Sequence, residues 1–530
     1  MADISELEAY RNQVASRIEQ EEEVKEPSKP KGGDDEPPIE FVQKCYMANE
    51  VGDSLLYNYR HRDQFICNIV SGNWMYYQGP HWEIDYHNKT KAACEAVVKQ
   101  YLRLLDKIEE QLGKLGTGKD YADDRKTLNF QKKNLLLRID RLRSDRGRNS
   151  LLNCAVSNSD PLTVVPDVLD QQPWLYPCKN GVIDLRTGEF RDGKPSDLLT
   201  VSSPTEWHGI TTPCLHWETF LREIFDNDQE VIDYLQKVIG YTITGLKSER
   251  LFNVFYGPHG QNGKGTLIDV IYRIMGVMAA PISSEMLMSQ KFGKSASAPS
   301  PEILDLKGRR LIWASETEER NSFASGKIKW FSGGDTLTGR GVSEKFQVSF
   351  DPTHVLFLIC NDRPKAPAKD SAFWERIKVF NFPFSFVSDP DPKKPHQKQR
   401  DGDLLKKLTA ESSGILAWMV RGCKKWQADG HLIPPQKIKD DSLDYRNHED
   451  DLQEFIDTNC VIDFEDATIE NRCSAKELYQ RFRTWWEENN SNRPINQKSF
   501  SDQLQLKGFK KLKSSGNFYQ FIRLTLALDA

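Results

Sequence analysis

The 530-residue sequence lacks several features that would define its class at once. Its ten cysteines are scattered singly and form no C-x-x-C pair, so neither a zinc site nor a disulfide framework is indicated. It contains neither a secretory signal nor an apolar run long enough to span a bilayer. No segment repeats at a fixed period. These absences predict a soluble cytoplasmic protein without a membrane partner.

An excess of one charge is also missing. The 72 Lys and Arg residues nearly balance the 77 Asp and Glu residues, which gives a formal net charge of −5. A nucleic-acid site would therefore have to be a local patch. Hydrophobic residues make up 38% of the chain, which suffices for about three domains at this length.

The pattern along the chain predicts five segments, which are residues 1–40, 41–210, 211–386, 387–445 and 446–530. The first is a charged, Pro- and Gly-rich stretch typical of a disordered acidic tail or linker. The second combines short aromatic strands with charged helices, and its basic run at 132–148 is interpreted as a solvated helix face. The third alternates helices with apolar strands, as in an α/β nucleotide-binding core. A linker with a helical extension follows, and three short helices with a terminal β-hairpin end the chain like a winged helix.

The most informative stretch is a glycine-rich loop between an apolar strand and an apolar-periodic helix. The strand at 251–256 runs into Gly257-Pro258-His259-Gly260-Gln261-Asn262-Gly263-Lys264-Gly265-Thr266. Glycines let backbone N–H groups turn toward phosphates, and the helix that follows presents its positive N-terminal end. Lys264 would reach the β- and γ-phosphates of ATP, while the Thr266 hydroxyl would hold Mg²⁺. Gly257, Gly260, Asn262, Gly263 and Gly265 complete the predicted nucleotide-binding set.

This loop departs from the general phosphate-loop pattern in two ways. Five residues rather than four separate Gly257 from Gly263, and Gly265 stands where Ser or Thr normally follows the lysine. Thr266 is then the available hydroxyl. A plain glycine-rich connection is the alternative, but the strand–loop–helix order favours nucleotide binding.

A second apolar strand, at 310–315, ends in carboxylates. A nucleoside triphosphatase needs an acid there, because a carboxylate holds the water shell of Mg²⁺ and polarises the attacking water. Glu316 and Glu318 would face the same side of an extended chain. We prefer Glu316 as the catalytic acid and as a Mg²⁺ contact through water. The alternative is an acidic cap on the next helix.

Two further candidate residues, Asn361 and Arg376, lie at the ends of predicted strands. An apolar run at 354–360 delivers Asn361 to the carboxyl end of a buried strand, where its amide could orient the lytic water; a simple turn before Pro364 is the alternative. Arg376 precedes another apolar strand and could enter a neighbouring subunit's site as an arginine finger. By residue type alone, a surface ion pair is the commoner role of an arginine.

The segment at 327–345 contains glycines that allow a protruding hairpin. Arg340 and Lys345 in it could meet DNA phosphates. An ordinary solvated hairpin is the alternative and, from residue types alone, the preferred interpretation.

In this order, the motifs resemble those of superfamily 3 helicases, and more narrowly the helicase part of phage, plasmid and poxvirus primase-helicases. The resemblance extends over 45–530, since Trp74, Trp82 and the stretch 180–185 resemble the domain that precedes this core. It implies an AAA+ type P-loop core with an α+β N-terminal domain and a C-terminal winged-helix-like domain. It also implies a hexameric ring that pulls one DNA strand through its pore.

The resemblance assigns roles as well. Lys264 and Thr266 become phosphate and Mg²⁺ contacts, Glu316 the acid, Asn361 the sensor and Arg376 the finger. Single-stranded and forked DNA become the partners, in replication of a virus or mobile element within the host cytoplasm. Because the first 40 residues are too short for a primase domain, we expect no primer synthesis by this chain, and the acidic tail could dock a separate primase.

Two other functional classes stay open from the sequence. One is a DNA-binding replication initiator in which ATP only drives assembly. The other is a small-molecule kinase with a phosphate loop, which should not respond to single-stranded DNA.

Overall fold

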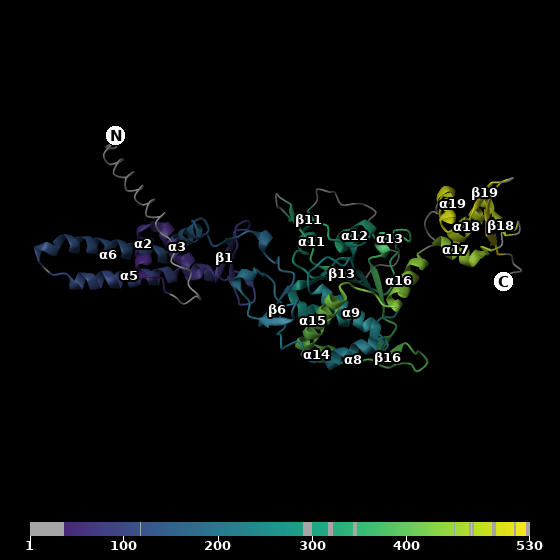
Figure 1. The fold of residues 1–530 in the computed structure, drawn as a ribbon, viewed down its shortest axis with the longest axis horizontal. Helices are drawn as coiled ribbons and strands as arrows, with labels where there is room; N and C mark the ends of the chain where they lie inside the picture. The colour runs from purple at the N-terminus through teal and green to yellow at the C-terminus, as the bar shows by residue number, and fades with distance from the viewer. Residues whose placement is uncertain are drawn as a thin grey trace, which may run out of the picture.

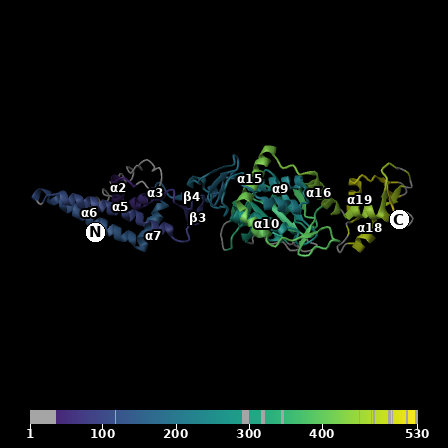
Figure 2. The ribbon, with the colours of Figure 1, turned by 90° about the horizontal axis from the view of Figure 1, so that it is seen from below.

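The computed structural model describes residues 36–525, apart from 117, 290–298, 316–321, 343–346, 450, 466–467, 469–470, 490–493, 495 and 514–515. The described elements follow one another along a single long axis. The N-terminal helices lie at one end, a five-stranded sheet lies in the middle and the C-terminal elements lie at the other end (Figures 1 and 2). No helix in these described ranges is long and apolar enough to cross a membrane.

The N-terminal part packs helices beside a small sheet. The helices are α2 (Ile39–Met47), α3 (Asn49–His61), α4 (Lys89–Ala93), α5 (Glu95–Lys114), α6 (Ala122–Arg143) and α7 (Asp145–Ala155). The sheet has the order β3-β2-β1-β4, with β1 (Phe65–Asn68), β2 (Trp74–Tyr77), β3 (Trp82–Ile84) and β4 (Thr163–Val164). The aromatic strands predicted here are confirmed, and Phe65, Tyr76 and Trp82 are buried. Helix α2 begins inside the predicted tail, of which residues 1–35 lie outside the described part.

The basic run at 132–148 is not simply a solvated face, and that prediction was wrong for two of its arginines. Helix α6 lies against the helices that precede it and faces Asp53, which is only 1% exposed. Arg138 Nε donates to Asp53 Oδ1 at 3.0 Å, and Arg141 donates to Asp53 Oδ2 at 3.2 Å. The Tyr101 hydroxyl donates to the same carboxylate at 2.6 Å. A buried carboxylate requires such partners, which periodicity on α6 alone does not reveal.

The central sheet is entirely parallel and has the order β14-β8-β13-β10-β9. Its strands are β8 (Phe252–Tyr256), β9 (Ala279–Ile282), β10 (Leu311–Ser315), β13 (Val355–Cys360) and β14 (Ile377–Asn381). Parallel strands need crossover connections, and these place helices over both faces. The predicted α/β class is confirmed.

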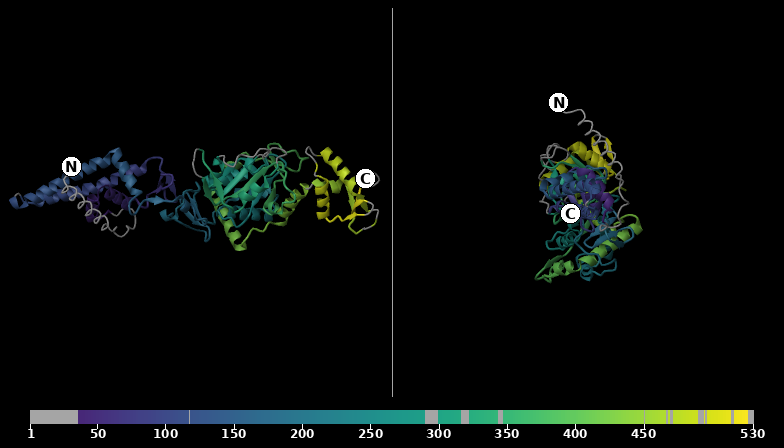
Figure 3. Two further views of the ribbon diagram at one scale, coloured as in Figure 1. Left: turned by 90° about the horizontal axis from the view of Figure 1, so that it is seen from above. Right: turned by 90° about the vertical axis from the view of Figure 1, so that its left-hand side faces the viewer.

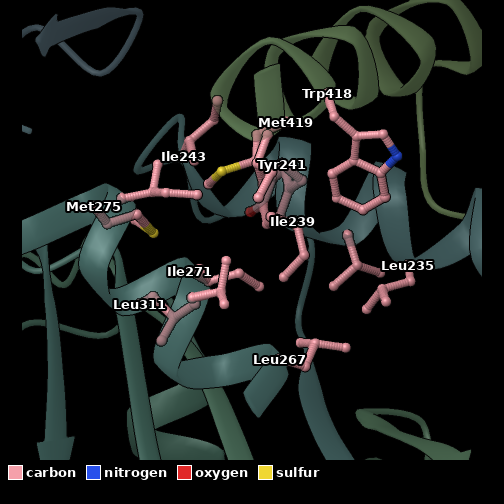
Figure 4. Packing of buried hydrophobic residues seen from close by; sticks show 14 of the residues in the cluster. Leu235, Ile239, Tyr241, Ile243, Leu267, Ile271, Met275, Leu311, Trp418 and Met419 are labelled. Atoms are coloured by element: carbon pink, nitrogen blue, oxygen red, sulfur yellow. The ribbon is translucent and has the colours of Figure 1, made fainter. Parts of the chain in front are cut away.

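One face of the sheet is covered by α9 (Gln229–Thr242), α10 (Lys264–Met275) and α15 (Ser412–Asp429). Figure 4 shows Leu235, Leu267, Ile271 and Trp418 converging from these helices into one apolar cluster. The other face is covered by α12 (Ser325–Ser332), α13 (Ser371–Trp374) and α16 (Gln436–His448). Side chains alternate along β8 accordingly, so that Phe255 joins the first cluster while Phe252 and Val254 join the second.

Helices α9 and α15 touch through their backbones. A Cβ on Gly240 would lie 2.0 Å from the Cys423 nitrogen, and a Cβ on Gly422 would lie 2.0 Å from the Gln236 carbonyl oxygen. Glycine in a helix interior costs about 1 kcal/mol relative to alanine. Here the close approach of the two helices requires it.

A buried arginine joins the hairpin of β5 (Leu175–Cys178) and β6 (Gly181–Asp184) to the sheet. Arg310, just before β10, donates to the Leu175 carbonyl oxygen at 2.8 Å and to the Ile243 carbonyl oxygen. Its guanidinium also lies over the Tyr176 ring. The hairpin and the central sheet therefore share one apolar cluster.

The C-terminal part contains α17 (Asp451–Asn459), β17 (Cys460–Ile462), β18 (Arg472–Ser474), α18 (Ala475–Asn489), α19 (Gln497–Leu506), β19 (Lys511–Lys513), β20 (Asn517–Gln520) and β21 (Ile522–Leu524). The three predicted helices and the hairpin β19–β20 are confirmed. The predicted final strand is interrupted at Phe521, whose φ is +71°. This left-handed residue ends the pairing with β18 and β19, and β21 pairs with β17 instead. Figure 3 shows these elements at the end of the molecule opposite the N-terminal helices.

Candidate nucleotide site

The glycine-rich loop connects the carboxyl end of β8 to the N-terminus of α10. Strand β8 lies between β13 and β14, so that neighbouring strands end on both sides of the loop. Gly263 immediately precedes the helix with φ +87°. A Cβ at Gly263 would lie 2.7 Å from the Ile224 side chain, so both backbone angle and space require glycine here. Ligands bind at this edge in parallel α/β sheets.

Asn262 fixes the shape of the loop from inside. Its side chain is 5% exposed, and its Nδ2 donates to the Gly257 carbonyl oxygen at 3.2 Å and to the His259 carbonyl oxygen at 2.5 Å. Gly257 gives Asn262 the necessary room, because a Cβ there would lie 2.4 Å from Nδ2. These contacts preorganise the loop before any ligand binds.

Lys264 is the central charged residue of the site. It is 3% exposed, and its Nζ donates to the Gly257 carbonyl oxygen at 3.0 Å and to Asn361 Oδ1 at 2.9 Å. Burial lowers the pKa of Lys264 to about 8. Both of these partners are neutral oxygens, so an anion at the loop would gain a partly desolvated positive charge.

Asn361 reaches the loop because it follows β13. Strand β13 pairs with β8 on one side and with β10 on the other, and Ser315 at the end of β10 is in register with Ile359. The chain therefore leaves β10 at the edge where Lys264 and Asn361 meet. Glu316 comes next, but Glu316 and Glu318 lie outside the described residues.

Three predicted ligand contacts lie at the mouth of the loop. A Cβ on Gly260 or on Gly265 would meet no described atom within 4 Å. Neighbouring described residues therefore do not require these two glycines, and they leave space at the loop surface. Thr266 lies half-buried in the first turn of α10, two residues after Lys264.

A segment far along the chain braces the loop, and the sequence analysis missed it. This flap consists of β15 (Ser385–Val387), β16 (Gln397–Gln399) and their connection. Ser385 Oγ donates to the Gly260 carbonyl oxygen at 2.8 Å, and the Phe386 amide donates to the Gln261 carbonyl oxygen at 2.9 Å. The imidazole of His396 stacks on that of His259, with ring centroids 4.2 Å apart. The sequence analysis assigned most of these residues only to the linker that begins at residue 387.

Arg376 is not brought together with Lys264 and Asn361. It immediately precedes β14, and Ile377 is in register with Phe252, the first residue of β8. Arg376 therefore lies at the amino edge of the sheet, about 16 Å of strand away from the loop. Its guanidinium donates to the Ala372 carbonyl oxygen, while its buried Nε has no partner among the described residues.

The segment predicted as a hairpin begins as part of helix α12. A hairpin follows it, in which β11 (Leu337–Gly339) is antiparallel to β12 (Val348–Phe350), a strand that lies beyond the predicted segment. Arg340 directly follows β11, and its backbone exchanges hydrogen bonds with Ser300. Lys345, in the connection between the strands, lies outside the described residues.

Comparison with known proteins gives a family match for the N-terminal part and relatives that cover more of the chain. Residues 54–226 match the family described as D5 N terminal like. A candidate helicase of Acanthamoeba polyphaga mimivirus is 26% identical over 456 residues, which cover 83% of this chain and 46% of the relative. A candidate helicase of Invertebrate iridescent virus 3 is 26% identical over 343 residues, which cover 60% of this chain and 36% of the relative. A third, from Sputnik virophage, is 24% identical over 48% of this chain and 33% of the relative.

The chain thus spans about half the length of the mimivirus relative and about a third of the other two. Among solved structures, the NrS-1 C terminal region is 12% identical in sequence. The match covers 69% of this chain and 87% of that chain, with a TM-score of 0.38. The family and sequence matches confirm the predicted resemblance to the helicase part of viral primase-helicases.

Proposed function

We propose that this chain is an ATP-dependent DNA helicase of the AAA+ class, which acts as a hexameric ring in replication of a virus or mobile element. The observation that carries the proposal is the buried ammonium of Lys264, held between a loop carbonyl and the amide of Asn361. A triphosphate would replace these neutral partners with charged oxygens and strengthen both hydrogen bonding and charge pairing. The likeness to viral helicases supports the choice among nucleotide-dependent activities.

The residues at the loop would have different roles in hydrolysis. Lys264 would bind the β- and γ-phosphates, and the backbone of the loop from Gly257 to Gly265 would surround them. Asn361, released from Lys264, would orient the attacking water with its amide. The backbone of the loop is already held by Asn262 and the flap, so its amides would need little reorganisation.

The residues also fit a magnesium nucleotide. Thr266 supplies a hydroxyl in the first turn of α10, and Glu316 would follow the strand that ends beside Asn361. Mg²⁺ bound with ATP would neutralise charge on the phosphate oxygens. Thr266 would hold this cation directly, and Glu316 would hold it through water.

The position of Arg376 supports a site shared between subunits. About 16 Å of strand separates it from the phosphate loop of its own chain, too far for direct contact with the same nucleotide. In the proposed ring, the amino edge of one subunit would lie near the loop of another. There Arg376 would stabilise charge on the transferring phosphoryl group as a finger.

The DNA contacts are proposed for other elements. Arg340 and Lys345 belong to the hairpin β11–β12, a suitable shape for a pore loop that grips phosphates. The C-terminal order of α17, β18, α18, α19, β19 and β20 supports a winged-helix-like domain that binds duplex DNA or partner proteins.

The proposal is tested by ATP hydrolysis and strand separation with one protein preparation. We expect single-stranded DNA to stimulate hydrolysis at concentrations that assemble the ring, and a forked duplex to be separated only in the presence of ATP. Lys264→Ala should lose both activities. Hydrolysis that does not respond to DNA, together with intact forks at every protein concentration, would refute the helicase.

A further inference from the structure

A pocket lies at the end of β14, next to the strand that leads into the phosphate loop, and its lining is unlike that of a phosphate site. The cavity has a volume of about 260 Å³. Its lining includes Phe225, Asp226, Asn381, Phe384, Lys437 and Asp441. These come from the end of α8 (Leu215–Ile224), the end of β14, the flap approach and the first turns of α16.

The pocket is directly connected to the loop through the sheet. Asn381 is in register with Tyr256, the last residue of β8 before the loop. The next residue, Phe382, donates its amide to the Tyr256 carbonyl oxygen at 2.7 Å, and its own carbonyl oxygen would be 2.8 Å from a Cβ on Gly257. The wall at Phe225 continues from Ile224, which contacts Gly263. A ligand whose phosphates occupy the loop can therefore extend toward β14 into this pocket.

Two side-chain oxygens of residues that line the pocket are unsatisfied. Asn381 Oδ1 and Asp441 Oδ2 are both buried, and neither has a hydrogen-bond partner in the described part of the chain. Buried acceptors without partners are uncommon and costly in folded proteins. They would gain most from a ligand that brings N–H donors.

Aromatic and cationic groups complete the lining. Phe225 and Phe384 offer ring surface to a flat ligand. Lys437 lies one helical turn before Asp441 and supplies a donor beside the two acceptors. Such a set matches the edge of adenine, where an exocyclic amine stands beside a ring nitrogen that accepts a hydrogen bond.

We propose that this pocket binds the base of the nucleotide and selects adenine, with Asn381 and Asp441 accepting hydrogen bonds from the exocyclic amine. The proposal rests on the proposed function, because the phosphate loop must hold the same nucleotide. Guanine would present a carbonyl oxygen where adenine has its amine, and that oxygen would face the two acceptors. A purine without an exocyclic group would leave both acceptors unpaired.

The test compares equilibrium binding of ATP, GTP and purine riboside triphosphate, which lacks the amine, to the full chain. We expect wild type to bind ATP about tenfold more tightly than either of the others. Asn381→Ala and Asp441→Ala should remove that preference while binding purine riboside triphosphate as well as wild type does. Retained affinity for this analogue excludes a simple loss of folding. Asp440→Ala, on the next residue of α16, is the matched control and should keep the preference for ATP.

The outcomes separate this proposal from the function on which it rests. Equal affinity of wild type for ATP and the analogue, or equal affinity for ATP and GTP, overturns the base pocket and leaves the phosphate loop intact. Binding of none of the three by wild type overturns the nucleotide site itself, and the base pocket with it.

Discussion

Asp53 and Lys264 are both almost fully buried charged residues, yet their surroundings differ. Asp53 lies on α3 and accepts hydrogen bonds from Tyr101 and from two arginines of α6. Lys264, at the carboxyl edge of the central sheet, donates to one carbonyl and one amide oxygen. The arginines neutralise the Asp53 carboxylate within the fold, whereas the hydrogen-bond partners of the Lys264 ammonium are neutral. Asp53 therefore has the ionic partners of a structural charge, whereas Lys264 combines neutral partners with a position at the carboxyl edge of the sheet, where ligands bind.

Removing the Lys264 charge gives the largest expected effect on activity. Lys264→Ala should reduce ATP hydrolysis at least about a thousandfold, because the phosphates lose their buried cation. Lys247→Ala is the matched control: burial also lowers the pKa of Lys247 to about 8, but its Nζ donates to the His354 carbonyl oxygen before β13. Steady-state hydrolysis and melting temperature measured on both variants distinguish the two lysines. An equal loss of hydrolysis in both would contradict a ligand-binding role specific to Lys264.

The position of Arg376 extends the comparison to a charge whose partner is expected in another subunit. Arg376→Ala should lower hydrolysis by about a hundredfold or more. Mixing this variant with Lys264→Ala should restore part of the activity, since some interfaces then combine an intact loop with an intact finger. Mixing it with the Lys264→Ala, Arg376→Ala double variant supplies no intact finger and is the control. Restoration in neither mixture would argue against a shared site.

Removing the Asp53 carboxylate should affect stability rather than nucleotide binding. Asp53→Ala leaves Arg138 buried without its partner and should destabilise the N-terminal part by about 3 kcal/mol. Glu50→Ala removes a more exposed partner of Arg141 and should cost less than about 1 kcal/mol. Urea titration followed by circular dichroism measures the difference. Similar shifts for the two variants would show that the Asp53 cluster is no stronger than a surface pair.

The smallest expected effect is on pH dependence. With a pKa of about 8, Lys264 loses its proton as the pH rises through 8, and triphosphate affinity should fall by up to about tenfold per pH unit above it. The buried charge also costs folding free energy below pH 8, and that cost disappears between pH 8 and the ordinary lysine pKa of 10.5. Titration calorimetry from pH 7 to pH 9.5 checks the affinity. The Lys247→Ala variant should show the same fall of triphosphate affinity with pH as wild type. An affinity of wild type that does not change with pH would contradict the role of the Lys264 charge.

The sequence allowed β8, β10, β13 and β14 of the central sheet and the glycine-rich loop to be predicted because their signals are local, whereas β9 was not predicted. Apolar runs mark buried parallel strands, and the glycines lie next to the lysine they serve. The same logic placed Asn361 at a strand end, where it does contact Lys264. The functional roles of all the predicted site residues stay predictions, and these residues include Lys264, Thr266, Glu316, Arg340, Lys345, Asn361 and Arg376.

Contacts between distant parts of the chain could not be predicted in this way. Ser385 braces Gly260 from 125 positions away, and Arg138 pairs with Asp53 from 85 positions away. Neither contact produces a recognisable pattern in the sequence, because each depends on how whole helices and strands pack against one another. Phe521 illustrates a local failure, since a single left-handed residue ends a strand that its apolar neighbours predict to continue.

The glycine crossing of α9 and α15 has a mechanical consequence. Helix α9 leads through a short connection into β8 and the phosphate loop, while α15 leads through α16 toward the C-terminal elements. At Gly240 and Gly422 the two helices meet backbone to backbone, without compressible side chains between them. A pull on the C-terminal elements would therefore reach the strand that carries the loop through a stiff joint. Force could travel along this joint with little loss to side-chain rearrangement.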